Sequence, residues 1–190
     1  MLFRSNAIVA HPGIKAISFT GGTKTGAHIA SVAAPQFKKL SLELGGKNPN
    51  IIFADCNYEK MLSTTLHSSF SNQGQICLCG SRIFVERPIY EKFKNDFVER
   101  TSKLKVGSPE SSDSKIGAVV SESHMEKILS YVELAKKEGG SVLCGGKRMI
   151  LEGEFENGYY IEPTIIEGLS YDCRTNQEEI FGPVVTLTPF

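Results

Sequence analysis

One cysteine stands directly after a segment that favours a tight turn. Residues 71–77 read SNQGQIC, so Cys77 follows Gly74 shortly after the expected end of a helix. Glycine lets the backbone turn tightly, and a cysteine at the end of such a turn can point into a cleft where backbone N–H groups stabilise a thiolate or an oxyanion. The alternative is a buried thiol that acts as a small apolar side chain. The pattern by itself leaves both interpretations open.

A carboxylate suited to general-base chemistry lies upstream of this cysteine. Glu43 stands between Leu42 and Leu44 in a stretch that reads LSLEL. Apolar surroundings disfavour the charged form of a carboxyl group, which makes it a better base near neutral pH. The alternative is an ordinary solvent-facing acid on an amphipathic strand.

Two further segments have the composition of binding loops. Residues 20–26 read TGGTKTG between an expected strand and an expected helix, where backbone N–H groups can bind phosphate. The segment is neither the G-x-G-x-x-G fingerprint nor a Walker A loop, so a plain tight turn is the alternative. Residues 178–183 read EEIFGP, and an acid beside a ring could hold a ribose and a flat heterocycle. The alternative there is a loop with a hydrophobic anchor.

The cysteines favour neither a metal site nor a disulfide framework. Cys77 and Cys79 form a C-x-C pair, but no second cysteine pair or spaced histidine pair follows, so we expect no metal. The chain has 5 cysteines, an odd number without framework spacing. We therefore expect a reducing compartment, the cytoplasm.

Strand-like and helical patterns alternate along the chain, which favours an α/β fold built from parallel β–α–β units. The turn-rich residues 45–50 are the best candidate for a domain boundary. Asn57 suits a helix N-cap, Pro88 a first helical turn, and residues 123–126 a capping box. The expected strands are residues 16–19, 40–44, 51–53, 82–86, 141–144, 160–166 and 184–189, and the expected helices end near residues 33, 70, 107 and 139.

Composition narrows the class of partner. The chain of 190 residues is 41% hydrophobic and 22% charged, as soluble globular proteins are, and its formal net charge is zero. Nucleic acids and anionic membranes select for basic surfaces, so neither is expected as a partner. No stretch approaches the roughly 18 apolar residues of a membrane span. A small molecule is the expected partner.

Taken together, the four segments resemble the aldehyde dehydrogenase superfamily, and the resemblance runs from about His11 to Phe190. Residues 42–47 resemble the family's glutamate signature, and residues 72–77 resemble its cysteine signature at the family's spacing. Residues 17–26 resemble the strand, turn and helix at the cofactor's phosphates, and residues 179–183 the motif at the nicotinamide riboside. The sequence around both signatures is similar to the branch that oxidises aminomuconic and hydroxymuconic semialdehydes.

The resemblance implies a function and a set of roles. Cys77 would be the nucleophile and Glu43 the general base in the oxidation of an aldehyde, by this branch a semialdehyde. Residues 1–45 would be the C-terminal part of a Rossmann-type NAD(P)-binding domain, and residues 46–190 the N-terminal part of the catalytic domain. The parent enzyme would be a homo-oligomer. The cofactor would be NAD, with NADP not excluded, and its contacts would be Gly21, Gly22, Thr23, Gly26, Leu44, Glu179 and Phe181.

Two other classes of function stay open. Members of the family are longer than this chain, so the resemblance implies a piece of an enzyme, and a catalytically silent fragment or a partner-binding piece is an alternative. A thiol esterase or acyltransferase could use Cys77 without a dinucleotide. The glycine-rich turn and the Glu179–Phe181 motif favour an oxidoreductase over that third class.

Overall fold

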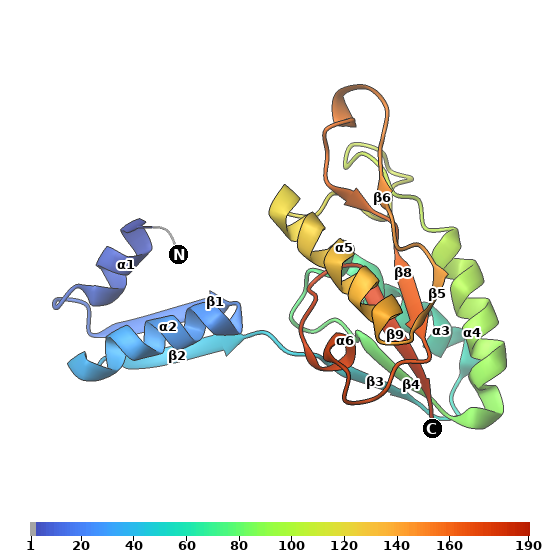
Figure 1. The fold of residues 1–190 in the computed structure, drawn as a ribbon, viewed down its shortest axis with the longest axis horizontal. Coiled ribbons are helices and arrows are strands. Elements are labelled where there is room, and N and C mark those ends of the chain that lie inside the picture. Colours follow the sequence, from blue (N-terminus) through green and yellow to red (C-terminus); the bar gives the residue numbers. More distant parts are fainter. Residues whose placement is uncertain (1–2) are drawn as a thin grey trace. The chain divides into compact units, whose positions relative to one another are not determined.

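The computed structural model describes residues 3–190, with side chains from Ser5 onward. It divides into two compact units, and the division lies between Gly46 and Lys47. The turn-rich break at residues 45–50 contains this position. In Figure 1 the first unit is coloured in shades of blue and the second from cyan to red. Each unit is described by itself.

The first unit is a small β–α–β arrangement preceded by a helix. Its elements are α1 (Phe3–Ala10), β1 (Ala16–Gly21), α2 (Thr23–Ala33), a short 3-10 turn (Ala34–Gln36) and β2 (Lys39–Leu44). The two strands are parallel, with Ala16 opposite Lys39 and Gly21 opposite Leu44. Both predicted strands and the helix between them are confirmed, whereas α1 was not predicted.

Two close contacts hold the first unit together. A Cβ atom added at Gly26 would lie 2.5 Å from a Leu44 methyl group, so the glycine lets α2 pack closely on β2. The buried Lys38 Nζ donates to the carbonyl oxygens of Val9 at 2.6 Å and His11 at 2.7 Å. A cation at the C-terminal end of a helix satisfies carbonyls that lack an intrahelical partner, so Lys38 fixes the end of α1.

The second unit contains a sheet of order β3-β4-β9-β8-β5. Neighbours from β3 to β8 are parallel, but β5 pairs with β8 in the antiparallel sense, so the purely parallel expectation is wrong at this edge. No helix connects β5 to β8, and without such a crossover the chain returns in the opposite direction. The strands of this sheet are β3 (Pro49–Ile52), β4 (Arg82–Val85), β5 (Ser141–Cys144), β8 (Thr164–Glu167) and β9 (Val184–Pro189). Strands β6 (Arg148–Met149) and β7 (Tyr160–Ile161) form a separate antiparallel pair.

Helices cover both faces of this sheet. Helices α3 (Tyr58–Phe70) and α4 (Arg87–Ser102) lie on one face and α5 (Glu122–Lys137) on the other, as Figure 1 shows. Successive strand residues point to opposite faces, so Ile165 packs in the cluster with α3 and α4 whereas Ile166 packs in the cluster with α5. Buried residues at helical spacing form the faces that pack on the sheet, such as Phe93 and Phe97 on α4 and Ile128 and Val132 on α5. The short helix α6 (Arg174–Gln177) precedes β9.

The ends of the helices depart from the sequence pattern in two places. Asn57 caps α3 as predicted, since its Oδ1 accepts from the Lys60 N–H at 3.1 Å. Helix α4 ends at Ser102, before the predicted stop near residue 107. The N-cap of α5 is Ser121, whose extended backbone (φ −165°, ψ 163°) and Oγ, accepting from the His124 N–H at 3.3 Å, place the helix start before Ser123. The predicted capping box is therefore wrong.

Residues 160–166 form two short strands and not one. Pro163 lies between β7 and β8, and proline has no N–H to donate to a ladder. Within residues 3–190, no helix is long and apolar enough to cross a membrane.

Candidate active site

The turn that leads to Cys77 has a strained backbone. Asn72 (φ 49°), Gln73 (φ 56°) and Gly74 (φ 68°) all lie in the left-handed region and reverse the chain after α3. A Cβ atom at Gly74 would lie 2.2 Å from the carbonyl oxygen of Gly182, so only glycine fits here. Non-glycine residues in this region cost about 1–3 kcal/mol each, and such strain concentrates at functional sites.

Hydrogen bonds fix this cysteine turn, residues 71–79. The Asn48 side-chain amide donates to the carbonyl oxygens of Cys77 at 2.6 Å and Cys79 at 3.3 Å. Gln75 Oε1 accepts from the Val120 N–H at 3.1 Å. Among the hydrogen bonds of residues 3–190, none engages the N–H of Cys77 itself. This N–H is therefore available to a negatively charged oxygen.

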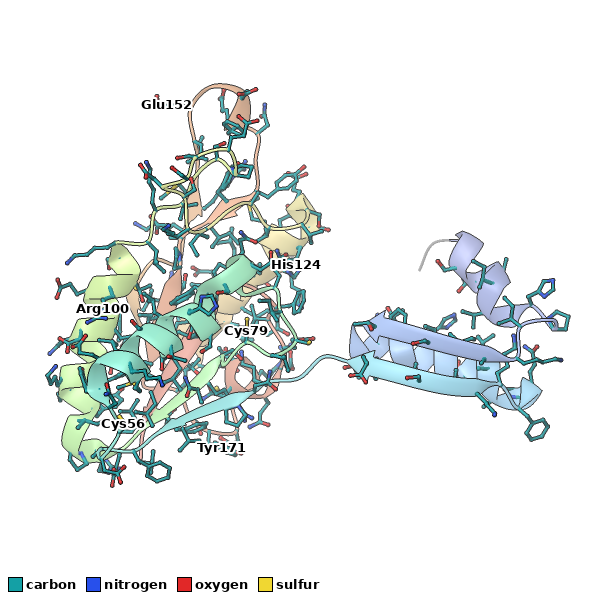
Figure 2. All side chains as sticks on the ribbon, turned by 180° about the vertical axis from the view of Figure 1, so that it is seen from behind. Cys56, Cys79, Arg100, His124, Glu152 and Tyr171 are labelled. Atoms are coloured by element: carbon teal, nitrogen blue, oxygen red, sulfur yellow. The ribbon has the colours of Figure 1, made fainter. Side chains whose placement is uncertain are left out.

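The two thiols of the C-x-C pair have different surroundings. Cys77 is exposed, whereas Cys79 is buried with 8% of its surface exposed. Burial raises the pKa of Cys79, which disfavours its thiolate form. Figure 2 labels Cys79 within the second unit. The described residues contain no cluster of ligands that could hold a metal ion. Cys77 is thus the better nucleophile of the pair.

The predicted binding loop, residues 178–183, lies against the cysteine turn through the contact between Gly182 and Gly74. Phe181 has φ 60°, and its carbonyl oxygen accepts from His124 Nε2 at 2.6 Å. The two rings meet edge to face, with centroids 6.1 Å apart. The structure therefore brings together two of the segments that the sequence singled out, both from the second unit.

A buried amine near this loop was not predicted. Lys47 Nζ is buried, and no hydrogen bond reaches it from the residues that the structure describes. Burial and, to a smaller extent, the charge of Arg82 lower the pKa of Lys47 to about 8, although the charge of Glu179 acts in the opposite direction. The lysine belongs to the stretch GGKNPN, whose composition indicated only a turn. Its charge lies within electrostatic reach of Glu179.

The glycine-rich segment of the first unit opens a helix. Gly22 is the N-cap of α2 (φ −67°, ψ 144°), and no side chain caps this helix. The carbonyl oxygen of Gly22 accepts from Thr25 and Gly26, whereas no partner among the described residues engages the N–H groups of Thr23 and Lys24. Open N–H groups at a helix N-terminus suit an anion such as phosphate. A cavity of about 470 Å³ adjoins them, lined by Asn6, Lys24, Thr25 and His28.

Glu43 belongs to the first unit, on β2. The period of two in this strand places Leu42 and Leu44 on the half-buried face and Glu43 on the exposed face. The alternation is as predicted, but within its own unit the carboxylate is not enclosed by the leucines. Leu44 packs against Gly26, next to the opening of α2.

Known proteins resemble this chain in sequence and in structure. Residues 4–190 match the profile described as "Aldehyde dehydrogenase family". The chain is 49% identical over 183 residues to a 2-aminomuconic 6-semialdehyde dehydrogenase from Pseudomonas sp and 50% identical over 187 residues to a 2-aminomuconic semialdehyde dehydrogenase from Danio rerio. These matches cover 96% and 97% of this chain but 37% and 38% of the relatives.

Solved structures agree with the sequence comparison. A crystal structure of betaine aldehyde dehydrogenase from Staphylococcus aureus in complex with NAD+ superimposes with a TM-score of 0.94 at 40% identity. The match covers 98% of this chain and 37% of that one. The chain therefore spans less than two fifths of the proteins that it matches.

Proposed function

Because this chain belongs to the aldehyde dehydrogenase family, we propose that it carries the catalytic centre for oxidation of an aldehyde to a carboxylic acid through Cys77, with NAD or NADP as acceptor. One observation carries the proposal furthest. Cys77 is an exposed thiol on a strained and hydrogen-bonded turn, and its own N–H is open to an oxyanion. A buried structural thiol would need neither feature.

The thiol performs the first step. The Cys77 thiolate adds to the aldehyde carbonyl carbon and forms a thiohemiacetal, whose oxygen carries the negative charge. The Cys77 N–H can donate to that oxygen, and losing one such donor typically costs roughly 10²–10³ in rate. A bound nicotinamide would supply the hydride acceptor for the same carbon. Departure of the hydride leaves a thioester on Cys77.

We assign the second step to Glu43. Its carboxylate would take a proton from water, the hydroxide would add to the thioester carbon, and the carbon–sulfur bond would break to release the carboxylic acid and the Cys77 thiolate. General-base catalysis of this kind contributes about 10²–10⁴ in rate. The exposed side chain on β2 is free to accept a proton from water.

The residues that would hold the cofactor fit its parts. The open N–H groups of Thr23 and Lys24 suit its phosphates, and a Cβ atom at Gly22 would face open space. Gly21 and Gly26 shape the same turn by lying close to the side chains of Phe19 and Leu44. Glu179 and the ring of Phe181 suit the ribose and nicotinamide. We accordingly assign residues 1–45 to the end of a Rossmann-type cofactor domain and residues 46–190 to the front of the catalytic domain.

The substrate that we propose is a semialdehyde. The relatives from Pseudomonas sp and Danio rerio, which are 49% and 50% identical to this chain, act on 2-aminomuconic semialdehyde according to their names. Such a substrate has a carboxylate at the end remote from the aldehyde. The free thiols suit a reducing compartment, so we place the protein in the cytoplasm, and we propose that the complete enzyme is a homo-oligomer.

Replacing each thiol of the C-x-C pair tests the assignment of the nucleophile. In the complete enzyme, Cys77→Ala should abolish aldehyde oxidation and any esterase activity, whereas Cys79→Ala should keep most of both. The matched pair controls for loss of packing, since Cys79 is the buried member. An inactive Cys79→Ala protein beside an active Cys77→Ala protein would refute the assignment. If the complete protein oxidised no aldehyde but hydrolysed esters without a dinucleotide, the result would favour a thiol esterase.

A further inference from the structure

Helix α5 presents a row of polar side chains on one face. They are His124, Lys127 and Tyr131 of the helix and its C-cap residue Glu138. Their separations of three, four and seven positions place side chains on the same side of a helix. Each of them forms a hydrogen bond with the segment 174–181, which consists of α6 and most of the binding loop. We call these four residues the α5 row. They contact the segment in reverse order along the chain, so the segment runs antiparallel to the helix.

The two ends of the row hold the ends of the segment. His124 Nε2 donates to the Phe181 carbonyl oxygen at 2.6 Å, and Lys127 Nζ donates to the Glu179 carbonyl oxygen at 3.0 Å. At the other end, the Glu138 carboxylate accepts from the Arg174 and Thr175 N–H groups and from the Thr175 hydroxyl at 2.6 Å. Most of these bonds are made to backbone atoms, so they fix the path of the segment.

The middle of the row holds a charged side chain. Tyr131 OH donates to Glu178 Oε2 at 2.5 Å, while Arg174 Nε donates to Glu178 Oε1 at 2.7 Å. Arg174 and Tyr131 together lower the pKa of Glu178 to about 2, so its carboxylate stays charged and keeps both donors near neutral pH. Hydrogen bonds to charged groups are stronger than neutral ones. Glu178 directly precedes Glu179.

The opposite side of the segment is anchored to the sheet. The buried Asn176 accepts from the Thr186 hydroxyl of β9 at 2.7 Å and donates to the Ser170 carbonyl oxygen at 2.9 Å. The segment is therefore fixed between α5 and β9. The Glu178 backbone N–H donates to the Arg174 carbonyl oxygen at 2.8 Å. Among the described residues, its side chain is held by Tyr131 and Arg174 and by no group of the sheet.

We propose that Tyr131 is a positioning residue. Its hydroxyl holds the Glu178 carboxylate and thereby fixes the positions of the neighbouring residues Glu179 and Phe181 against the α5 row. The inference rests on the proposed function, which assigns those two residues to the nicotinamide riboside. Tyr131 itself touches no reacting atom in this account. Its loss should therefore weaken use of the dinucleotide and leave the chemistry of the Cys77 thiol intact.

Hydrogen exchange tests the structural half of the inference. In the 190-residue chain, Tyr131→Phe removes one hydroxyl and keeps the ring. The Glu178 N–H donates to the Arg174 carbonyl oxygen at 2.8 Å, and we expect this amide to exchange about tenfold faster in the variant, the loss typical of one hydrogen bond to a charged group. Tyr171→Phe is the matched control, because Tyr171 lies just before the same segment, is 63% exposed, and has no hydroxyl hydrogen bond among the described residues (Figure 2). Equal exchange in the two variants would overturn the inference.

Steady-state kinetics of the complete enzyme test the functional half. Tyr131→Phe should raise KM for NAD about tenfold while KM for the aldehyde and the dinucleotide-independent esterase rate stay within twofold of wild type. Glu178→Gln, which still accepts from Tyr131 but loses the ion pair with Arg174, should show a smaller rise. A KM for NAD equal to that of wild type would overturn this inference and leave the proposed function standing. A wild-type enzyme that oxidises no aldehyde would refute the proposed function first, and the inference with it.

Discussion

Glu43 and Cys77 carry different steps of the proposed reaction, so the two residues can be separated experimentally. Glu43→Gln keeps the shape of the side chain and removes the base. Oxidation of the first equivalent of aldehyde should then proceed, though more slowly if Glu43 also activates the thiol. Hydrolysis of the thioester should stall, and steady turnover should fall by about 10²–10⁴. An acyl adduct on Cys77, detected as intact-protein mass after mixing with aldehyde and NAD, would be the direct product.

Two controls make this measurement decisive. The double variant with Cys77→Ala should form no adduct, which locates the acyl group on that sulfur. Circular dichroism separates a missing base from a misfolded protein. Turnover of Glu43→Gln near the wild-type rate would reduce Glu43 to an exposed residue of β2, the alternative that its sequence pattern left open.

The buried Lys47 makes a prediction about stability. Its pKa is about 8 in the folded protein and 10.5 without burial, so the folded state binds fewer protons between these values. The free energy of unfolding should therefore rise as pH increases from 8 to 10.5. Lys47→Met should remove that rise and stabilise the protein at pH 7 by an amount on the order of 1–3 kcal/mol, since one pKa unit corresponds to about 1.4 kcal/mol. Urea unfolding at pH 7 and pH 9.5 measures both effects.

The exposed Lys137→Met is the matched control for that experiment, since it removes the same charge from the surface. It should leave the pH dependence as in wild type. Identical curves for Lys47→Met and wild type would show that the Lys47 amine is solvated. Sequence alone could not identify this lysine, because the charged groups near it, such as Arg82 and Glu179, are distant in the chain and leave no local signal.

At the scale of secondary structure, the start of α5 can be tested with two serines that are separated by one residue. Ser121→Ala should destabilise the second unit by about 1 kcal/mol, the usual effect of losing an N-cap side chain. Ser123→Ala should change the free energy of unfolding little, because Ser123 lies inside the helix as its second residue. Thermal or urea unfolding of the two variants gives the comparison. A larger loss for Ser123→Ala would restore the capping box that the sequence favoured.

The elements show where sequence patterns succeed. Asn57 and the apolar face of α5 were predictable, because an N-cap and a helical repeat are local properties. The antiparallel edge strand β5 was not, since its direction depends on the absence of a crossover helix after it. The α5 row was not predictable either, because its partners follow 36 to 57 positions later in the chain.

At the scale of the whole molecule, the fold class was predictable from the sequence, whereas contacts between distant segments were not. The alternation of strands and helices predicted an α/β fold, and residues 45–50 contain the division between the two units. The cysteine turn and the loop at residues 178–183 were recognisable by composition, and their contact through Gly74 and Gly182 was not. Where two backbones approach closely, the only sign in the sequence is a glycine at the contact. Glycine also occurs in turns and at helix ends, so this sign does not identify the contact.

The last prediction concerns what the 190-residue chain can bind by itself. Its first unit has a sheet of two strands, β1 and β2. One face of this sheet is exposed along both strands, whereas parallel sheets are normally covered on both faces. The open N-terminus of α2 offers only a few N–H groups to a phosphate. We therefore predict that the purified chain binds NAD weakly or not at all and turns over no aldehyde. Calorimetric titration with NAD measures this directly, with the Gly22→Ala chain as a comparison for any weak binding at the turn. A Kd in the micromolar range, about −8 kcal/mol, would show instead that these two strands and one helix already form a competent dinucleotide site.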